Sequence, residues 1–459
     1  MGHIMEITDN TGLATKPKPI SAKLATKPIN LIQFAKLAGK NMLEVIPIET
    51  TQQTYLRGPT NIHWICDPEI ITEILVGKGK WFPKSQFTKD IIGSAVGNGL
   101  ILSEGEKWKA QRKRYSPLFA ARNLPMLAEH FALTGQEMAD AVVSGTDEID
   151  VAQMSKEATL TNISRVMFAG SDEVDPAVVR KGLDNYFEYI SYISLFDLMG
   201  MPSWVPRLKW MKGTAPVKDM RALAQNVIEK RRAEMRDEPK DFLDLMIAAL
   251  AEDTEDIDTT VDNLLTFVVA GHETAANTLA WGLYLLALYQ DVQTIIREEI
   301  SAACGSGPIT YESLKAMPRL RSHVYETMRL YPAAAFFARD ASEDLTVKDV
   351  HFAKGDAIFV PVYTLHRNSL LWDEPETYKA ERFFEVKEKP ERGQFIPFGD
   401  GPRICIGAQY AETEIMVLMA SLIRHVEFGM SEKNVPRPIL TFTMRPEGPL
   451  VLTAKAIKT

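Results

Sequence analysis

The middle of the chain repeats apolar residues at intervals of three and four positions, which is the spacing of helices with one buried face. Between about residues 104 and 330 this pattern predicts helices over 104–115, 124–142, 177–190, 216–235, 262–290 and 313–331. The central part of the fold is therefore expected to be α-helical.

Shorter β-type patterns lie on either side of this helical region. Residues 53–66 place β-branched and aromatic residues around an Arg-Gly-Pro turn, which predicts a pair of strands. Residues 345–364 and 440–452 predict further short strands. A loop-rich stretch over 366–404 precedes one long helix, which is expected to begin near residue 405.

The chain shows no obvious division into parts. It contains no glycine- and serine-rich linker, internal repeat or low-complexity block. We therefore expect a mainly α fold with a small β region. Residues 1–24, which are rich in lysine and proline, are expected to form a flexible leader, and residues 25–459 a single domain.

Charge and composition exclude several classes of protein. A formal net charge of -8 argues against a general nucleic-acid binder, because such proteins carry a basic surplus. The polar N-terminus and the lack of any apolar run of about 18 residues predict neither a signal sequence nor a membrane anchor. Only Cys66, Cys304 and Cys405 are present, which is no disulfide framework and fits the reducing cytoplasm.

One cysteine stands in an unusual setting, the stretch FGDGPRICIG. Gly399 and Gly401 favour a tight turn, because glycine tolerates a positive φ. A helical stripe follows Cys405 and consists of Ala411, Ile415, Leu418 and Leu422. The helix N-terminus is expected to hold the thiol as a thiolate, which suits a nucleophile or an iron ligand. A buried, inert cysteine is the alternative.

A second polar cluster interrupts the apolar run VVAGHETAANTLAWG. Gly271 is unexpected here, because glycine costs about 1 kcal/mol inside a helix. Glu273 and Thr274 are unexpected as well, because buried polar groups need hydrogen-bond partners. A zinc site of the H-E-x-x-H type is excluded, because Ala276 stands where the second histidine would be. A kink with Thr274 bonded to a carbonyl one turn earlier and a catalytic role both remain open.

Two further pairs share helix faces. Glu326 and Arg329 are three residues apart, and Trp108 and Arg112 are four apart. Each pair by itself is compatible with an ordinary structural role.

The pattern F-x-x-G-x-R-x-C-x-G resembles the haem-binding loop of the cytochrome P450 family. The resemblance implies a cytochrome P450 fold with haem b (heme b, iron protoporphyrin IX) ligated by the Cys405 thiolate, which favours O–O bond cleavage. It also implies that Arg403 pairs with a haem propionate, that Phe398 packs near the sulfur, and that Gly407 leaves room for the porphyrin.

The other patterns resemble further motifs of the same family, in the same order along the chain. By resemblance, Ala270 and Gly271 make space for dioxygen, while Glu273 and Thr274 supply protons as the catalytic pair. The Glu326–Arg329 motif is expected to pair with Arg382 as a scaffold, although Ala380 replaces the usual proline. The resemblance further implies that propionates are bound by Trp108, Arg112 and Arg339.

The resemblance implies a haem-thiolate monooxygenase of the soluble bacterial type. Its two electrons per turnover are expected from a ferredoxin or flavodoxin with a separate reductase, which would dock on the basic helix carrying Lys107, Lys109, Lys113 and Arg114. An ordinary solvated surface is the alternative for these charges.

The substrate is expected to be a small hydrophobic molecule that reacts with O2. Its pocket is expected to be lined from residues 87–101, 185–200, 268–269, 333–337 and 440–444. A haem-thiolate sensor without oxygenase activity, or a peroxide-driven enzyme, is the alternative.

Overall fold

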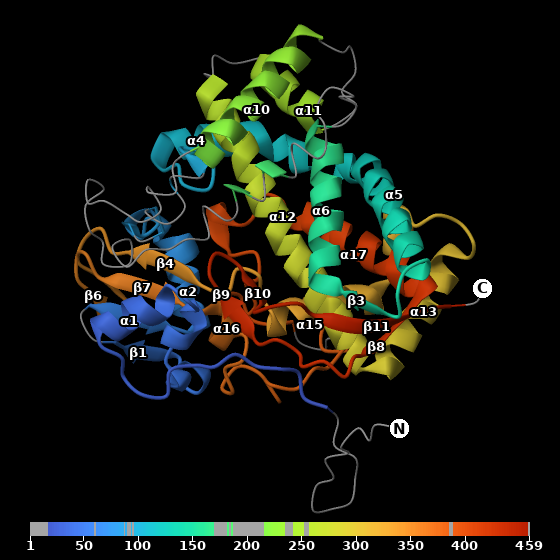
Figure 1. Ribbon diagram of the computed structural model, residues 1–459. Helices are drawn as coiled ribbons and strands as arrows, with labels where there is room; N and C mark the ends of the chain where they lie inside the picture. The colour runs from blue at the N-terminus through green and yellow to red at the C-terminus, as the bar shows by residue number, and fades with distance from the viewer. Residues whose placement is uncertain are drawn as a thin grey trace, which may run out of the picture.

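The computed structural model describes residues 17–58, 61–86, 88–89, 93, 96–168, 181–182, 185–186, 215–234, 242–251, 257–384 and 389–457. Figure 1 shows the long helices on one side of the molecule and one group of strands, with the N-terminal part of the chain, on the other, while a second group of strands lies below the helices. This arrangement agrees with the mainly α fold expected from the sequence.

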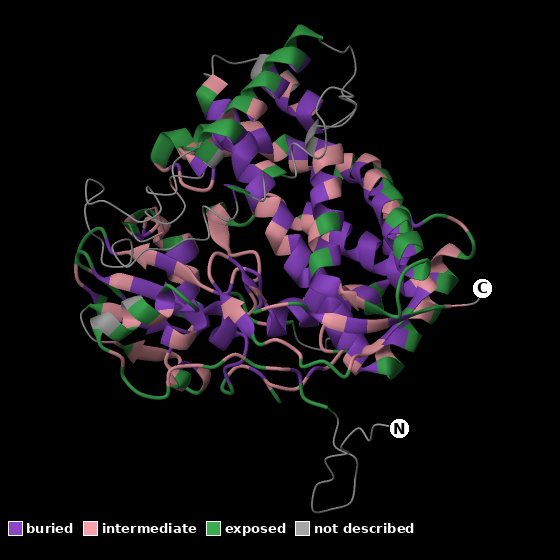
Figure 2. Cartoon of the chain, in the orientation of Figure 1, coloured by how far each residue is buried: buried purple, intermediate pink, exposed green. Residues whose placement is uncertain are grey.

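The helical part is built around α12, Ile257–Leu288. Helix α12 packs against α6, α10, α15 and α17, and Figure 2 shows that buried residues line most of its length. A helix that is buried on nearly all sides lies in the interior of the protein. The other long helices are α4 (Gly105–Tyr115), α5 (Leu124–Val143), α6 (Val151–Phe168), α10 (Ala215–Ala233), α11 (Phe242–Ala251), α13 (Gln290–Cys304), α15 (Pro318–Leu330) and α17 (Ala408–His425).

The β region joins distant parts of the sequence. A four-stranded sheet has the order β1 (Tyr55–Arg57), β2 (Ile62–Ile65), β7 (Ala357–Val360) and β4 (Phe337–Asp340). Strands β2 and β7 are parallel and the other two pairs are antiparallel. The strand pair predicted over 53–66 is thus confirmed.

The remaining strands form three smaller groups. They are the hairpin β5 (Leu345–Val347) and β6 (Val350–Phe352), the sheet β3 (Glu148–Asp150), β11 (Val451–Ala456) and β8 (Val426–Met430), and the pair β9 (Pro438–Leu440) and β10 (Met444–Pro446). The short strands expected beyond residue 340 are therefore present.

One predicted helix is wrong in its extent. The segment 313–331 forms a short helix α14, Tyr311–Leu314, and a separate helix α15 that starts at Pro318. Proline lacks a backbone N–H and is tolerated in the first turn but not in a helix interior, so the chain breaks before it. The helix predicted over 177–190 lies almost wholly outside the described residues.

The chain from Pro17 to Ala25, here called the N-terminal strap, lies across the helical core. Buried tyrosine hydroxyls bond its backbone: Tyr289 donates to the Pro17 carbonyl and Tyr331 to the Ile20 carbonyl at 2.5 and 2.7 Å. The N–H groups of Ile20 and Ala22 donate in turn to the hydroxyls of Tyr284 and Tyr363. Residues 17–24, assigned from the sequence to a flexible leader, are thus tied to the domain, and residues 1–16 lie outside the described part.

Among the described residues, no helix has both the length and the hydropathy needed to cross a bilayer.

Candidate active site

A cavity of about 380 Å³ separates α12 from the segment that carries Cys405. Its wall is mainly apolar and comes from α4, α12, β4, α17 and the loops between them. Of the residues singled out from the sequence, the cavity is lined by Trp108, Arg112, Ala270, Gly271, Thr274, Arg339, Phe398, Arg403, Cys405 and Gly407. The structure therefore brings together motifs that are far apart in the chain.

Tight backbone geometry fixes the loop that carries Cys405. Gly399 and Gly401 have φ values of 75° and 71°, as the sequence predicted. A Cβ on Gly401 would lie 2.5 Å from the carbonyl oxygen of Leu75, so any larger residue would push the loop away from the turn η3, Glu73–Gly77. The Cys405 N–H donates to the Phe398 carbonyl at 2.9 Å, which closes the loop.

An ion pair supports the same loop from outside. The guanidinium of Arg392 bonds both carboxylate oxygens of Asp400 at 2.8 and 2.9 Å, and Asp400 accepts from the Gly401 N–H. A bidentate pair fixes geometry as well as charge. Arg392 holds the pKa of the Asp400 carboxyl below its ordinary value.

Burial acts on the ionisation of Cys405. Its side chain faces the cavity and is exposed there. Loss of bulk water raises the pKa of the Cys405 thiol, and the Gly407 N–H and the Arg112 guanidinium only partly offset this. The thiolate expected from the sequence at the start of α17 stays a prediction: desolvation opposes it, and these two groups favour it.

Cationic side chains gather at one edge of the cavity. Arg112 donates to the Ile404 carbonyl at 2.8 Å and Arg403 to the Ser103 carbonyl at 2.7 Å. Arg403 also forms an ion pair with Glu104. Burial lowers the pKa of Arg339 to about 10, although Glu104 acts in the opposite direction. This edge can bind an acidic ligand group, because three arginines gather there and the ion pair of Glu104 involves only Arg403 among them.

A fourth cation, Lys84, was not identified from the sequence. It lines the cavity, donates to the Ile101 carbonyl and pairs across a β-bridge with Arg339. Burial lowers the pKa of Lys84 to about 7, and Arg339 and Arg403 lower it further in the same direction. A lysine inside the apolar stretch WFPKS was the one signal in the sequence that could have revealed it.

The opposite wall is formed by one face of α12. Ala270 and Gly271 line the cavity, and a Cβ on Gly271 would come within 3.3 Å of the Ile163 side chain. The Thr274 hydroxyl donates to the Ala270 carbonyl at 2.7 Å and also faces the cavity. The two readings left open for Thr274, a bond to the preceding turn and a place in the site, are thus compatible.

Glu273 lies beside this wall rather than in the lining of the cavity. Its buried Oε2 atom has no hydrogen-bond partner among the described residues. Burial raises the pKa of the Glu273 carboxyl, while Thr443, Lys156 and Arg445 act to lower it. A raised pKa favours the protonated form of this carboxyl, which is the form that a proton donor needs.

The histidine next to Glu273, His272, contacts helix α6. Nδ1 of His272 lies 2.9 Å from the Thr159 hydroxyl, and burial lowers the pKa of His272 to about 4. Among the described residues, no three His, Cys, Asp or Glu side chains come close enough together to hold a metal ion.

The Glu326, Arg329 and Arg382 side chains meet outside the cavity. Arg329 bonds both oxygens of Glu326 at 2.7 and 2.8 Å with both side chains fully buried, and Arg382 approaches the same carboxylate at 3.1 Å. Arg329 also donates to the carbonyls of His366 and Pro375. The group therefore joins α15 to the loops that precede the cysteine segment.

The substrate-pocket expectations are met only in part. Thr88, Leu100 and Ile101, together with most of the segment 333–337, line the cavity. Val268 and Val269 are buried elsewhere, because the lining face of α12 follows helical spacing from Thr266 and Phe267 to Ala270. The segment 440–444 does not reach the cavity, and 185–200 lies mostly outside the described residues.

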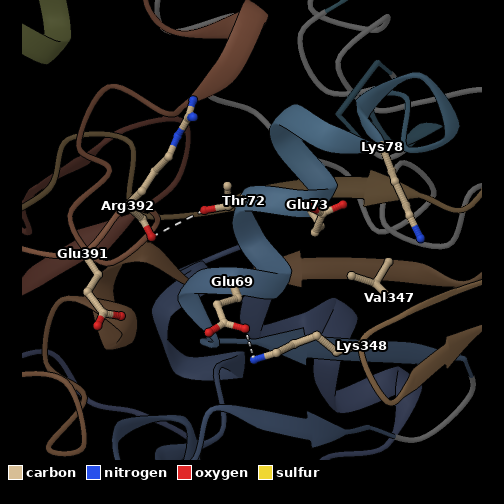
Figure 3. A pocket seen from close by; sticks show the side chains of 8 residues that line it. All are labelled: Glu69, Thr72, Glu73, Lys78, Val347, Lys348, Glu391 and Arg392. Atoms are coloured by element: carbon tan, nitrogen blue, oxygen red, sulfur yellow. Dashed lines mark hydrogen bonds and ion pairs between the residues drawn. The ribbon is translucent and has the colours of Figure 1, made fainter.

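A second hollow lies on the surface and has a different character. Figure 3 shows it between Glu69 and Glu73 on one side and Lys348 on the other, with a dashed ion pair from Lys348 to Glu69. That nitrogen–oxygen distance is 2.6 Å. The hollow is lined by charged side chains and contains none of the motif residues, so we do not assign the chemistry to it.

The residues of the inner cavity fit a haem. A thiol faces the cavity from the loop before α17, small residues face it from α12, and cations lie at one edge. An iron ligand, space beside the metal and partners for two carboxylates are the features that a haem requires of its protein.

Comparison with known proteins gives the same result. The family model described as Cytochrome P450 matches residues 33–454. The chain is 27% identical to cytochrome P450 714B3 of Zea mays, over 88% of this chain and 77% of that protein. It is 25% identical to the cytochrome P450 monooxygenase sphH of Aspergillus fumigatus, over 86% and 79%.

A mammalian relative matches over a similar length. The chain is 27% identical to cytochrome P450 3A9 of Rattus norvegicus, over 84% of this chain and 81% of that protein. These plant, fungal and mammalian relatives give no support to the bacterial-type assignment made from the sequence.

Proposed function

Because the chain belongs to the cytochrome P450 family, we propose that it inserts one oxygen atom of O2 into a small hydrophobic molecule held beside α12. Family membership makes the protein a haem-thiolate monooxygenase that binds haem b, uses O2 and receives electrons from a redox partner. When bound, the haem supplies the activation of O2. The observation that carries the proposal is the Cys405 thiol facing the motif face of α12 across one cavity.

Several side chains of this protein would hold the haem. Cys405 would ligate the iron, with the Gly407 N–H bonded to the sulfur. Arg112, Arg339 and Arg403, with the Trp108 ring, would hold the propionates at the cationic edge. The first test is the absorption difference spectrum of the reduced protein with and without carbon monoxide. The strongly red-shifted band of thiolate ligation is expected; a histidine-type spectrum would overturn the proposal.

The substrate class follows from the apolar wall. Leu100, Ile101, Phe267 and Phe336 present hydrocarbon surface to the cavity, so a hydrophobic molecule gains most on transfer from water. Titration of the ferric protein with fatty acids, terpenoids and aromatic compounds should shift the iron spin state for one class. Small charged compounds should give no shift.

We assign proton delivery to Glu273 and Thr274. The Thr274 hydroxyl faces the cavity, and the adjacent Glu273 carboxyl is buried with its pKa raised by desolvation. Thr274→Ala and Glu273→Gln should each divert reducing equivalents to peroxide and leave substrate affinity unchanged. Unchanged coupling in both variants would favour the alternative, a haem-thiolate sensor or a peroxide-driven enzyme.

We assign the redox partner, a ferredoxin or flavodoxin, to the exposed side of α4. Lys107, Lys109 and Lys113 are exposed there, and Arg112 ties this helix to the cysteine loop through Ile404, whose side chain is 40% exposed. A basic helix bonded to a loop with an exposed apolar side chain suits an acidic carrier.

The docking assignment has a direct kinetic test. Lys109→Glu with Lys113→Glu should slow the first electron transfer, most strongly at low salt. Lys455→Glu, on β11 at the other end of the molecule in Figure 1, is the control. Equal rates in both variants, or turnover with a flavoprotein reductase alone, would overturn the assignment.

We further propose that the enzyme works in the cytoplasm. Cys66, Cys304 and Cys405 form no disulfide, which suits a reducing compartment. Fractionation of expressing cells tests this: recovery with the membranes would contradict it.

A further inference from the structure

The part of the cavity wall that carries Leu100 and Ile101 is bonded to α12 by two buried side chains. The Leu100 N–H donates to Oδ1 of Asn263 at 2.8 Å, and the Asn98 N–H donates to Oδ2 of Asp262 at 2.8 Å. Asp262 and Asn263 have exposures of only 6% and 0%. Because the donors are backbone groups, these bonds fix the path of the loop itself.

The partners of Asn263 determine which way its amide points. Its Nδ2 atom donates to the Thr259 carbonyl at 2.9 Å, one turn earlier on α12. A carbonyl can only accept, so the amide nitrogen faces Thr259 and the amide oxygen faces the Leu100 N–H. A flipped amide would lose both bonds.

Two glycines allow the loop to approach α12 so closely. Gly97 has a φ of 53°, and a Cβ there would overlap the Asp262 carboxylate. A Cβ on Gly99 would overlap the Thr266 hydroxyl and lie 2.8 Å from the Asp262 carbonyl oxygen. Since Thr266 also lines the cavity, the loop and α12 meet at the cavity wall.

Helix α4 holds the other side of the same loop. The Nε2 atom of Gln111 donates to the Asn98 carbonyl at 3.0 Å, and the Ser103 hydroxyl donates to Oε1 of Gln111 at 2.5 Å. Gln111 is 1% exposed. Both backbone polar groups of Asn98 are therefore bonded, one to α12 and one to α4.

An arginine of α10 completes the contact from outside. Arg221 forms an ion pair with Oδ1 of Asp262 and a longer one with Asp258 at 3.4 Å. The two Asp262 oxygens thus have separate partners, Arg221 for Oδ1 and the Asn98 N–H for Oδ2. A buried carboxylate depends on such partners, so the loop depends on α10 as well as α12. We call Asp262, Asn263 and Arg221 the clasp.

We propose that the clasp consists of positioning residues for substrate selection: it holds Leu100 and Ile101 in the cavity wall and so sets how large an apolar molecule the cavity accepts. The three clasp residues lie behind the lining and not in it. The inference rests on the proposed function only in taking the inner cavity as the ligand site.

Nitrogen ligands of the haem iron test this without turnover, because their binding shifts the Soret band of the ferric holoprotein. Imidazole reaches only the iron, whereas 4-phenylimidazole also needs the apolar wall. Arg221→Gln should weaken the binding of 4-phenylimidazole relative to imidazole by about tenfold, since the phenyl group loses contact with a displaced wall. Arg221→Lys restores the charge and should recover most of this loss.

A double variant tests whether the effect passes through the wall. Leu100→Ala should by itself weaken 4-phenylimidazole binding. In the Leu100→Ala background Arg221→Gln should have little further effect, because both changes remove the same contact.

Hydrogen exchange reports the loop directly. The Asn98 and Leu100 amides are the two donors to the clasp, so Arg221→Gln should speed their exchange in the holoprotein by about tenfold. Arg165→Gln is the matched control, because the Arg165 side chain is 27% exposed, close to the 31% of Arg221, and pairs with Glu137 between α6 and α5. It should leave both amides and both ligand affinities as in the parent protein.

The outcomes separate the clasp from the proposed function. A carbon monoxide spectrum without the thiolate band overturns the proposed function and not the clasp, because imidazole binding needs only a haem and amide exchange needs none. Parent exchange rates in Arg221→Gln, or the same change in Arg165→Gln, overturn the clasp. Faster exchange with an unchanged affinity ratio of the two ligands also overturns it, as do additive effects of Arg221→Gln and Leu100→Ala.

Discussion

The guanidinium carbon of Arg403 lies 4.1 Å from the centre of the Trp108 ring, although one residue belongs to the cysteine loop and the other to α4. This cation–π contact joins two motifs that are separate in the sequence. Since Arg112 of the same helix also bonds the carbonyl of Ile404, α4 and the loop form one unit at the edge of the haem cavity.

Replacing Trp108 should therefore weaken haem retention. Such a contact is worth about 0.5–2 kcal/mol, so Trp108→Leu should speed haem loss by roughly 2- to 30-fold, and Trp108→Phe by less. Transfer of haem to apomyoglobin measures the rate. Trp81→Leu is the control, because Trp81 has a similar contact with Lys80 outside the cavity. Equal effects in both variants would contradict a specific role for Trp108.

Breaking the buried pair of Glu326 and Arg329 should strongly lower the stability of the protein. Glu326→Gln leaves Arg329 charged and fully buried, which should lower the free energy of unfolding by about 3 kcal/mol or more. Urea unfolding of the holoprotein measures it. Glu312→Gln removes a pair of the same spacing with Lys315 on the surface and should have no measurable effect. Similar values for both variants would rule out the scaffold role.

Lys84 should make the stability of the haem-free protein depend on pH. Its pKa is lowered from 10.5 to about 7 in the folded chain, so between these values the unfolded state binds more protons. Stability should therefore rise with pH across this interval, and Lys84→Met should remove that rise. Urea unfolding at several pH values tests this, with the exposed Lys113→Met as control. A rise that persists in Lys84→Met would contradict the assignment.

Glu414 should make stability fall as pH rises, which is opposite to the effect of Lys84. The Asn162 Nδ2 atom donates to it at 2.8 Å, but burial raises the pKa of the Glu414 carboxyl from 4.5 to about 8. The folded state then holds more protons than the unfolded state, so this contribution is complete below pH 4.5 and is lost as pH rises through 8.

Glu414→Gln keeps the shape and removes the titration. The difference in free energy of unfolding between Glu414→Gln and the parent protein should shift steadily in favour of Glu414→Gln as pH rises from 4.5 to about 8. Glu412→Gln, on the same helix but partly exposed beside Arg321, is the matched control. Parallel pH profiles for Glu414→Gln and the parent would show that Glu414 is ionised in the fold.

The sequence could predict those features of the site that depend only on residues close together in the chain. The glycines around Cys405, the helix carrying Trp108 and Arg112, and the Glu326–Arg329 spacing depend on neighbours within a few residues. Lys84, Asn162 and Thr443 acquire their surroundings from partners far away in the chain, so no short pattern marks them. The effect of desolvation on the pKa of Cys405 could not be predicted for the same reason, because burial is a property of the whole fold.

The N-terminal strap is held through its backbone, because tyrosine hydroxyls bond carbonyl and N–H groups of residues 17–22, and through Ile20, Ala22 and Leu24, which pack against the core. The hydrogen bonds depend on the path of the chain, whereas the packing depends on these three side chains. Many sequences could thus replace the strap, provided that an extended segment of the same length keeps apolar residues at these positions. Shortening it would leave Tyr289 and Tyr331 with unpaired hydroxyl hydrogens beside the core, so its length is constrained as well as its apolar positions.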